Sequence, residues 1–139
     1  MIRHFEHTAD VGFELTAGDL NALFDAARRA LLELLVSCPS REGSIPRSIT
    51  LEAESLEGLL VAWLDELLYL VQTHGLLPVQ SAVAVSAAPA GYHLAALLNC
   101  APLDVEAHGW QGEVKGATYH GLKLVQENGN WRARVVLDV

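Results

Sequence analysis

Cysteine is scarce in this chain, and the two residues present, Cys38 and Cys100, lie far apart and form no CxxC motif. Their number and spacing argue against a disulfide framework and a zinc ribbon, and they favour a reducing compartment. The first residues lack the apolar segment of a signal peptide, and no uncharged apolar run reaches the roughly 18 residues that a membrane span needs. We therefore expect a soluble cytoplasmic protein with no membrane partner.

Positive charge is also scarce, since nine Lys and Arg residues stand against seventeen Asp and Glu residues, for a net charge of -8. Phosphate backbones repel such a chain, which argues against direct nucleic-acid binding through a broad basic surface. The GxxxxGKS/T, GxGxxG, GxSxG and HExxH motifs are all absent, so no nucleotide-binding or hydrolase signature is found. The charge balance fits a protein partner, a cation or a small basic ligand better.

The chain does have enough apolar sequence for a packed core. Hydrophobic residues make up 51% of its 139 residues and charged residues only 19%, a composition typical of a globular protein. This length fits one domain, which we expect to span residues 1–139.

Two segments show the spacing of amphipathic helices. Residues 19–36 begin with Asp19, a good N-cap, and the charged residues of this segment lie largely off its apolar stripe. Residues 56–73 follow the cap residue Ser55 and are apolar over more than half of the helix circumference, so we expect this helix to pack between layers. Gly75 is a suitable residue to end it. The off-stripe charges of the first helix are Asp25, Arg28, Arg29 and Glu33.

Alternating apolar residues and turn signals predict strands in most of the remaining chain. Residues 38–47 contain prolines and a glycine and are expected to form a surface loop. Helices early in the chain and strands late in it indicate an α+β fold. Two amphipathic helices pack on a mostly antiparallel β-sheet in a single two-layer domain. Strands are expected at 11–17, 48–53, 79–87, 92–100, 113–126 and 131–139, with a further short strand at 102–107.

The Asn128-Gly129 pair is a strong signal for a β-hairpin between the last two strands. A loop of two or four residues places Tyr119 opposite Asp138 and Thr118 opposite Val139. A loop of three residues would put Asp138 on the other face from Tyr119.

The same register puts Lys115, Ala117 and Tyr119 on one face with Asp138, because side chains alternate along a strand. Lys115 is then four residues beyond Tyr119, too far to touch Asp138 unless a bulge intervenes. Gly116 and Gly121 would allow such a bulge.

Two aspartates near opposite ends of the chain are the main candidates for a site. Asp10 lies in the polar stretch before the first expected strand, and Asp138 is isolated in the apolar strand Val135 to Val139. We expect these strands to meet and the two carboxylates to share one cation. Carboxylate and main-chain oxygens suit calcium or magnesium better than zinc. The alternatives are a turn or cap role for Asp10 and simple exposure to solvent for Asp138.

The other candidates carry ordinary structural alternatives. His7 is either a cation ligand or a structural hydrogen-bonding residue. Asp65, next to Glu66 on the second helix, is either part of a solvated pair or a contact for a basic partner. Together with Tyr119 and Lys115, His7 could also serve a stand-alone metal-dependent hydrolase or nuclease, although no motif supports that reading.

Three blocks of the sequence resemble the archease family. They are Glu6-His7-Thr8-Ala9-Asp10-Val11, the helix block Leu59-Leu60 to Trp63-Leu64-Asp65-Glu66-Leu67-Leu68-Tyr69, and Glu113-Val114-Lys115-Gly116-Ala117-Thr118-Tyr119-His120 with the closing Val136-Leu137-Asp138-Val139. The blocks occur in the family's order and span nearly the whole chain. Two departures are Gly116, where alanine is usual, and Asn21-Ala22, where the family commonly has Glu-Glu.

This resemblance implies a function that composition does not show. Archeases are accessory proteins, not enzymes, of the RtcB-type tRNA-splicing RNA ligase, and they promote ligase guanylylation and multiple turnover. The family's divalent cation, calcium with magnesium or manganese as alternatives, would fall on Asp10, Asp138 and a main-chain or terminal oxygen of Val139. Lys115 and Asp65 match further functional positions of the family.

Overall fold

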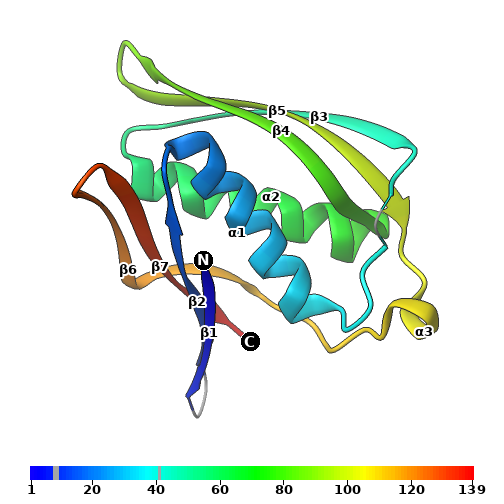
Figure 1. The fold of residues 1–139 in the computed structure, drawn as a ribbon. Helices are drawn as coiled ribbons and strands as arrows, with labels where there is room; N and C mark the ends of the chain where they lie inside the picture. The colour runs from blue at the N-terminus through cyan, green and yellow to red at the C-terminus, as the bar shows by residue number, and fades with distance from the viewer. Residues whose placement is uncertain (8–9, 41) are drawn as a thin grey trace.

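The computed structural model describes residues 1–7, 10–40 and 42–139. Its strands form two antiparallel sheets, and the two long helices lie between them (Figure 1). None of the helices in these ranges combines the length and apolar character needed to cross a lipid bilayer. In chain order the elements are β1 (Ile2–His7), β2 (Asp10–Ala17), α1 (Leu20–Leu35), β3 (Ile45–Ala53), α2 (Leu56–His74), β4 (Leu76–Ala88), β5 (Gly91–Pro102), α3 (Val105–His108), β6 (Gly116–Glu127) and β7 (Asn130–Asp138).

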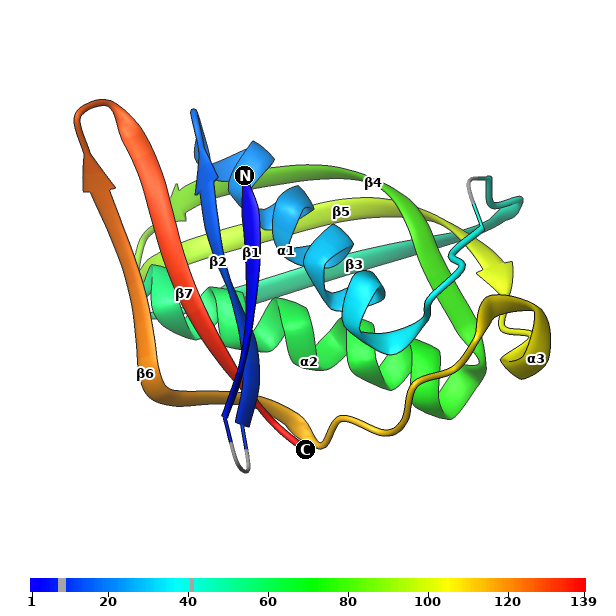
Figure 2. The ribbon, with the colours of Figure 1, turned by 60° about the horizontal axis from the view of Figure 1, so that its bottom comes forward.

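The α+β class and the antiparallel pairing are confirmed, but the predicted two-layer arrangement with one sheet is wrong, because the helices lie between two sheets. The strands are divided between a four-stranded sheet of order β1-β2-β7-β6 and a three-stranded sheet of order β3-β5-β4. α1 packs against β4 of one sheet and β2 of the other, and α2 packs against β3 and β6 (Figure 2). Each helix therefore has a sheet on either side, which explains why the second helix is apolar around so much of its circumference.

Both long helices begin where the sequence signals indicate. Asp19 Oδ1 accepts a hydrogen bond from the Ala22 amide at 2.8 Å, and Ser55 Oγ accepts one from the Gly58 amide at 3.0 Å. Such caps satisfy amides in the first turn that have no partner within the helix. Gly75 ends α2 in the left-handed region at φ 64°, as predicted.

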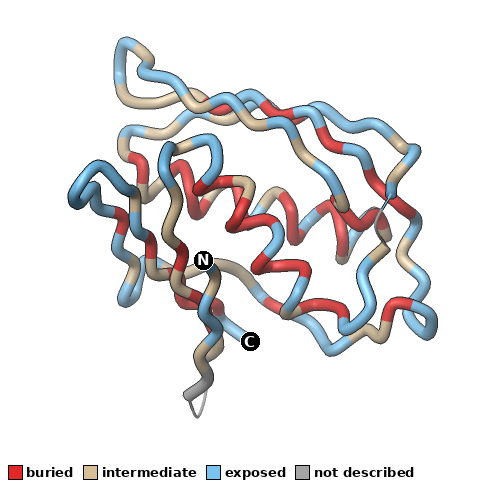
Figure 3. Tube along the Cα trace, viewed as in Figure 1, coloured by how far each residue is buried: buried red, intermediate tan, exposed pale blue. Residues whose placement is uncertain are grey.

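Buried residues of both helices and both sheets, which are red in Figure 3, belong to one contiguous core. Its largest member is Trp63, whose indole N–H donates to the Phe24 carbonyl of α1 at 2.9 Å. That bond lets a polar group lie in an apolar core without losing a partner. Each large apolar side chain buried here contributes roughly 1.5–3 kcal/mol to folding.

Arg28 departs from the expected polar face of α1, because only 5% of it is exposed. Its guanidinium donates to the carbonyls of Pro78 and Val79 and to Ser81 Oγ, each at 3.0 Å, and pairs with Asp25 at 3.0 Å. Ser81 also donates to Asp25. The β4 register shifts between Pro78 and Gln80, so the arginine meets carbonyls at a bulge. A buried charge is tolerated here because it is paired and hydrogen-bonded.

Two elements differ from the sequence prediction. β1, which pairs with β2, was not expected. Residues 102–107, expected to hold a short strand, instead contain α3, because Asp104 Oδ1 accepts hydrogen bonds from the amides of Glu106 and Ala107. Gly109 ends this single turn in the left-handed region at φ 66°.

The β6–β7 hairpin follows the expected register only near its turn. Asn128 and Gly129 have positive φ angles of 52° and 81°, as a type I′ turn requires, and Lys123 pairs with Arg134 as predicted. Between Thr118 and Lys123 the register then shifts.

The shift overturns the predicted partners of Asp138 and its neighbours. Thr118 pairs with Val136 rather than Val139, and Gly116, not Tyr119, pairs with Asp138. Ala117 pairs with Leu137, so Ala117 does not share a face with Asp138. β6 advances five positions from Thr118 to Lys123 while β7 advances two, so β6 contains a bulge of three extra residues.

Candidate functional site

The strand that begins at Asp10 pairs with the last strand, so the expected meeting of the two ends is confirmed. The register places Asp10 directly opposite Asp138, with Gly116 opposite Asp138 on the other side. Three strands therefore meet at one end of the four-stranded sheet, beside the point marked C in Figure 2. His7 pairs with Asp10 along the backbone, but the side chains of His7 and Asp10 lie outside the described residues.

Lys115 lies beside Asp138 because of the bulge in β6. The Lys115 amide donates to the Asp138 carbonyl at 2.7 Å, so the backbone of the lysine extends the pairing of β6 with β7. In an uninterrupted hairpin the two residues would have been too far apart. The bulge that the sequence allowed thus brings the backbone of Lys115 beside Asp138, while the Lys115 side chain stays exposed to solvent.

Asp65 joins the same corner from α2. Its Oδ1 accepts a hydrogen bond from the Ala117 amide at 2.9 Å, which fixes the start of β6 against the helix. A Cβ at Gly116 would lie 3.2 Å from Asp65 Oδ1, so the strand passes close to this carboxylate. The carboxylate therefore holds the strand that carries Lys115 in place.

Gln72 is a residue that sequence reasoning missed. It lies seven residues after Asp65, two helical turns further along the same side of α2. Its amide nitrogen donates to the Val114 carbonyl and its amide oxygen accepts from the Val114 N–H, both at 2.8 Å. The Gln72 side chain thus makes the two backbone hydrogen bonds to Val114 that a neighbouring strand would otherwise make. The sequence signal that could have identified Gln72 is its spacing, because Asp65 and Gln72 are two polar residues seven positions apart on an apolar helix.

Tyr119 lies away from the aspartates. It falls within the bulge, 66% of it is exposed, and a Cβ at Gly58 would be 3.5 Å from its hydroxyl oxygen. Gly58 belongs to the first turn of α2, whereas Asp65 lies about two turns further on. The structure therefore separates Tyr119 from Asp138, contrary to the expected pairing.

The oxygen-rich chemistry of this corner suits a hard divalent cation. Asp138 is exposed and Val139 is 45% exposed, so both can be reached from solvent. Among the described residues no three His, Cys, Asp or Glu side chains gather as a metal-binding group. A cation shared by Asp10, Asp138 and Val139 stays a prediction.

A serine and a histidine contact one another at the other end of the molecule. Ser40 Oγ lies 2.6 Å from His108 Nε2, while His108 Nδ1 accepts the Asp104 backbone N–H at 2.9 Å. Because a backbone amide can only donate, Nδ1 carries no proton, and the neutral ring donates from Nε2 to the serine. This is the reverse of the arrangement in which a histidine activates a nucleophile, so the pair ties the loop to α3.

Both cysteines are free thiols, in agreement with the argument against a disulfide framework. Cys38 is exposed, whereas Cys100 is buried on β5. Burial raises the pKa of the Cys100 thiol, and the nearby positive charge of Arg47 acts in the opposite direction with a smaller effect. A buried thiol with a raised pKa has little thiolate and is a poor nucleophile.

Comparison with known proteins identifies the family. Residues 3–139 match the Archease protein family (MTH1598/TM1083). The chain is 35% identical to the protein archease of Pyrococcus abyssi, over 98% of this chain and 96% of the relative. It is also 35% identical to the protein archease of Pyrobaculum islandicum, over 99% of this chain and 94% of the relative.

Two solved structures have the same fold. The solution structure of Methanobacterium thermoautotrophicum protein 1598 superposes with a TM-score of 0.82 at 31% identity, covering 99% of this chain and 98% of that one. The crystal structure of a Thermotoga maritima protein, described as an archease and possible chaperone, gives a TM-score of 0.63 at 20% identity. It covers 100% of this chain and 98% of that one, and at this identity it supports the fold alone.

Proposed function

Because the chain belongs to the archease family, we propose that it is a non-enzymatic accessory protein of an RtcB-type RNA ligase in the cytoplasm, active in tRNA splicing. It would promote guanylylation and multiple turnover of the ligase. The observation that carries the proposal is the convergence of the family-matched residues Asp10, Lys115 and Asp138 at one end of the four-stranded sheet.

The residues that would hold a divalent cation are Asp10, Asp138 and a main-chain oxygen of Val139. Like charges at directly opposed positions of neighbouring strands destabilise a sheet, and the register sets two aspartates at such positions. A shared cation would remove this penalty, and hard oxygen ligands favour calcium, with magnesium or manganese as alternatives. The cation would supply positive charge at an otherwise acidic end of the protein.

Lys115 would contact the ligase, and Asp65 would hold Lys115 in the position for that contact. Lys115 is exposed beside Asp138, where its ammonium group can meet an acidic group of the ligase. Asp65 holds the first residues of β6 and so fixes where that lysine lies. Complementary charges of this kind give fast and salt-sensitive association with a protein partner.

The test is RNA ligation by a purified RtcB-type ligase, with this protein added in sub-stoichiometric amounts. We expect the wild-type chain to raise the number of ligations per ligase and the level of guanylylated ligase. Unchanged turnover and guanylylation would contradict the accessory role.

An Asp138→Asn variant tests the cation separately from the fold. It should lose both cation binding and stimulation, while its circular dichroism spectrum and unfolding midpoint stay near wild type, because Asp138 is exposed. The matched control is Glu52→Gln, which removes an exposed acid from β3 in the other sheet. Full stimulation by Asp138→Asn would refute the cation role, and RNA hydrolysis by the chain alone would support the hydrolase alternative instead.

A further inference from the structure

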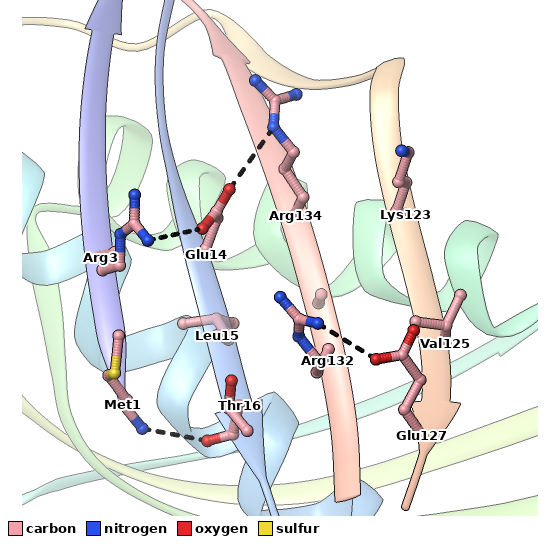
Figure 4. A pocket seen from close by; sticks show the side chains of 11 residues that line it. Met1, Arg3, Glu14, Leu15, Thr16, Lys123, Val125, Glu127, Arg132 and Arg134 are labelled. Carbon is pink, nitrogen blue, oxygen red and sulfur yellow. Dashed lines mark hydrogen bonds and ion pairs between the residues drawn. The ribbon is translucent and has the colours of Figure 1, made fainter.

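A concave pocket on the four-stranded sheet gathers positive charge in an otherwise acidic chain (Figure 4). It lies on the outer face of that sheet, the face turned away from the helices. Its volume is about 320 Å³, near the lower end of the roughly 300–1,000 Å³ typical of small-ligand sites. The charged residues that line it are Arg3, Glu14, Lys123, Glu127, Arg132 and Arg134.

The distribution of charge sets this pocket apart from the rest of the surface. Four of the nine Lys and Arg residues line it, together with only two of the seventeen Asp and Glu residues, so its side chains carry a net charge of +2. The remaining five basic and fifteen acidic residues leave the rest of the chain at −10. An anion is therefore attracted to this face and repelled elsewhere.

Strand register places the charges in a row across the sheet. Arg3 of β1 pairs with Glu14 of β2, Glu14 pairs with Arg134 of β7, and Arg134 pairs with Lys123 of β6. Residues directly opposed on neighbouring strands lie on the same face, so all four side chains meet the same pocket. Figure 4 shows Arg3 and Arg134 on either side of the Glu14 carboxylate.

Apart from one bond from Arg134 to the Gly121 carbonyl, the side-chain donors in this row make no hydrogen bond to any residue that the structure describes. The Glu14 carboxylate lies 3.8 Å from Arg3 Nη1 and 3.9 Å from Arg134 Nε, beyond hydrogen-bond distance. Lys123 has neither an ion pair nor a side-chain hydrogen bond to any residue in the described part of the chain. Exposed ion pairs at such distances contribute little, so an incoming anion can compete for these groups.

Arg134 is held in place before any ligand arrives. Its guanidinium carbon lies 4.5 Å above the centre of the Phe5 ring, and its Nη1 donates to the Gly121 carbonyl at 3.2 Å. The Phe5 ring lies across Gly12 on the outer face of the sheet, and a Cβ on Gly12 would be 2.5 Å from the ring. A guanidinium fixed by stacking loses less entropy on binding than a free one.

We propose that this pocket binds the phosphate group of a small anionic ligand. A phosphate monoester carries about two negative charges and so matches the +2 of the pocket, whereas a single carboxylate would leave half of it uncompensated. Pyrophosphate carries roughly two to three negative charges and is the stronger probe of the same site. Arginine forks suit tetrahedral oxyanions, and Arg3 and Arg134 supply two of them. Arg132 Nη1 already donates to Glu127 Oε2 at 3.1 Å, so only its remaining N–H groups can face the ligand. Val125, 43% exposed at the rim, offers apolar contact to the organic part of the ligand.

This inference is independent of the proposed accessory function. Arg134 lies four residues from Asp138 along β7, which is about 13 Å in an extended strand, so the two sites occupy separate parts of the sheet. Phosphate binding can therefore be measured on the chain alone, with a chelator present to exclude cation effects.

The experiment is a titration of the isotopically labelled chain with sodium pyrophosphate, followed by amide chemical shifts at near-physiological salt. We expect saturable shifts at Lys123, Arg132 and Arg134 and weaker binding as salt rises. Lys123→Gln should weaken binding by about tenfold, because a charge-assisted hydrogen bond is lost. Glu14→Gln should strengthen binding, since it removes the anion at the centre of the row.

The matched control is Arg47→Gln, which removes the same charge from an exposed residue of β3 in the other sheet and should leave affinity unchanged. Absence of saturation, or shifts that map to another surface, would overturn the proposal. An equal loss in Arg47→Gln and Lys123→Gln would also overturn it, since net charge alone would then explain binding. Tricarballylate binding as tightly as pyrophosphate would assign the face to carboxylates, and tighter binding of a short RNA without a terminal phosphate would assign it to nucleic acid.

Discussion

The two halves of the β6–β7 hairpin are built in different ways. Near the turn, from Lys123 to Arg134, the strands pair continuously, and Asn128 and Gly129 supply the positive φ angles of the loop. Toward the open end, the register shifts by three residues before Gly116 meets Asp138. The turn-proximal half carries part of the basic pocket, and the distal half carries the candidate cation site.

The difference shows that turn chemistry sets register only locally. In the distal half, polar side chains of α2 hold the chain: Gln72 makes two hydrogen bonds to Val114, and Asp65 accepts one from Ala117. These contacts fix residues 114–117 against the helix, and the intervening bulge absorbs the mismatch with the turn. If the two halves are independent, a change in one should leave the other intact.

The largest effect is expected from Gln72→Ala. It leaves the N–H and C=O of the buried Val114 without partners, so the free energy of unfolding should fall by about 2–4 kcal/mol. Urea unfolding measures this change. The control Gln126→Ala removes an exposed glutamine from the turn-proximal half and should change stability by less than about 0.5 kcal/mol. Equal losses would mean that α2 does not determine the distal register.

Asp65→Ala should have a smaller effect, about 1 kcal/mol, because a single hydrogen bond to the exposed Ala117 region is lost. The variant should also weaken stimulation of the ligase, since the strand that carries Lys115 is no longer fixed. Asp65→Asn keeps a carbonyl oxygen as acceptor and should restore most of the stability. If Asp65→Asn loses stimulation while keeping stability, the charge of Asp65 contacts the partner directly.

Gly121→Ala and Gly129→Ala form a matched pair, because both glycines have positive φ, 69° and 81°. Each substitution should cost roughly 1 kcal/mol in unfolding free energy from backbone strain alone. A Cβ at Gly121 would also lie 2.7 Å from Arg134 Nη1, whereas nothing lies within 4 Å at Gly129. Only Gly121→Ala should therefore weaken pyrophosphate binding, and a similar loss in Gly129→Ala would show that strain at the turn reaches the pocket.

The smallest structural change is expected from deleting residues 119–121. The deletion removes the three extra residues, so Leu122 can follow Thr118 and pair opposite Val135 without a change of face. Gly116 should remain opposite Asp138, as cross-strand nuclear Overhauser contacts between their α protons would report. Loss of these contacts would show that the bulge itself, and not α2, places the distal half.

Local signals predicted much of the fold. Asp19, Ser55 and Gly75 mark helix ends, and Asn128-Gly129 marks the hairpin, because each acts through its own backbone. β1 escaped prediction because its pattern is inverted: His4 turns toward α1, where it lies 2.7 Å from Glu33, and Phe5 lies on the outer face. Alternation of apolar residues cannot reveal a strand whose polar residue faces the helix layer.

The individual residues of the site could be predicted from the sequence, but the way in which the fold brings them together could not. The isolation of Asp138 in an apolar strand singled it out, and the pairing of the first expected strand with the last placed Asp10 opposite it. The approach of Lys115 depends on a bulge whose size is set by contacts of α2, which are far away in sequence. The basic pocket was hidden by net charge, because a total of -8 carries no information on where the positive charges lie.

The buried Arg28 limits how α1 can lie on the three-stranded sheet. Its guanidinium is satisfied only where the bulged backbone of β4 offers the carbonyls of Pro78 and Val79 beside Ser81. If the helix slid by one turn along β4, Arg28 would keep its ion pair with Asp25 of the same helix but would lose its hydrogen bonds to the backbone of β4. The leucines of α1 could pack against the sheet in several alignments. Arg28 alone selects one of these alignments and so fixes the position of the helix on the sheet.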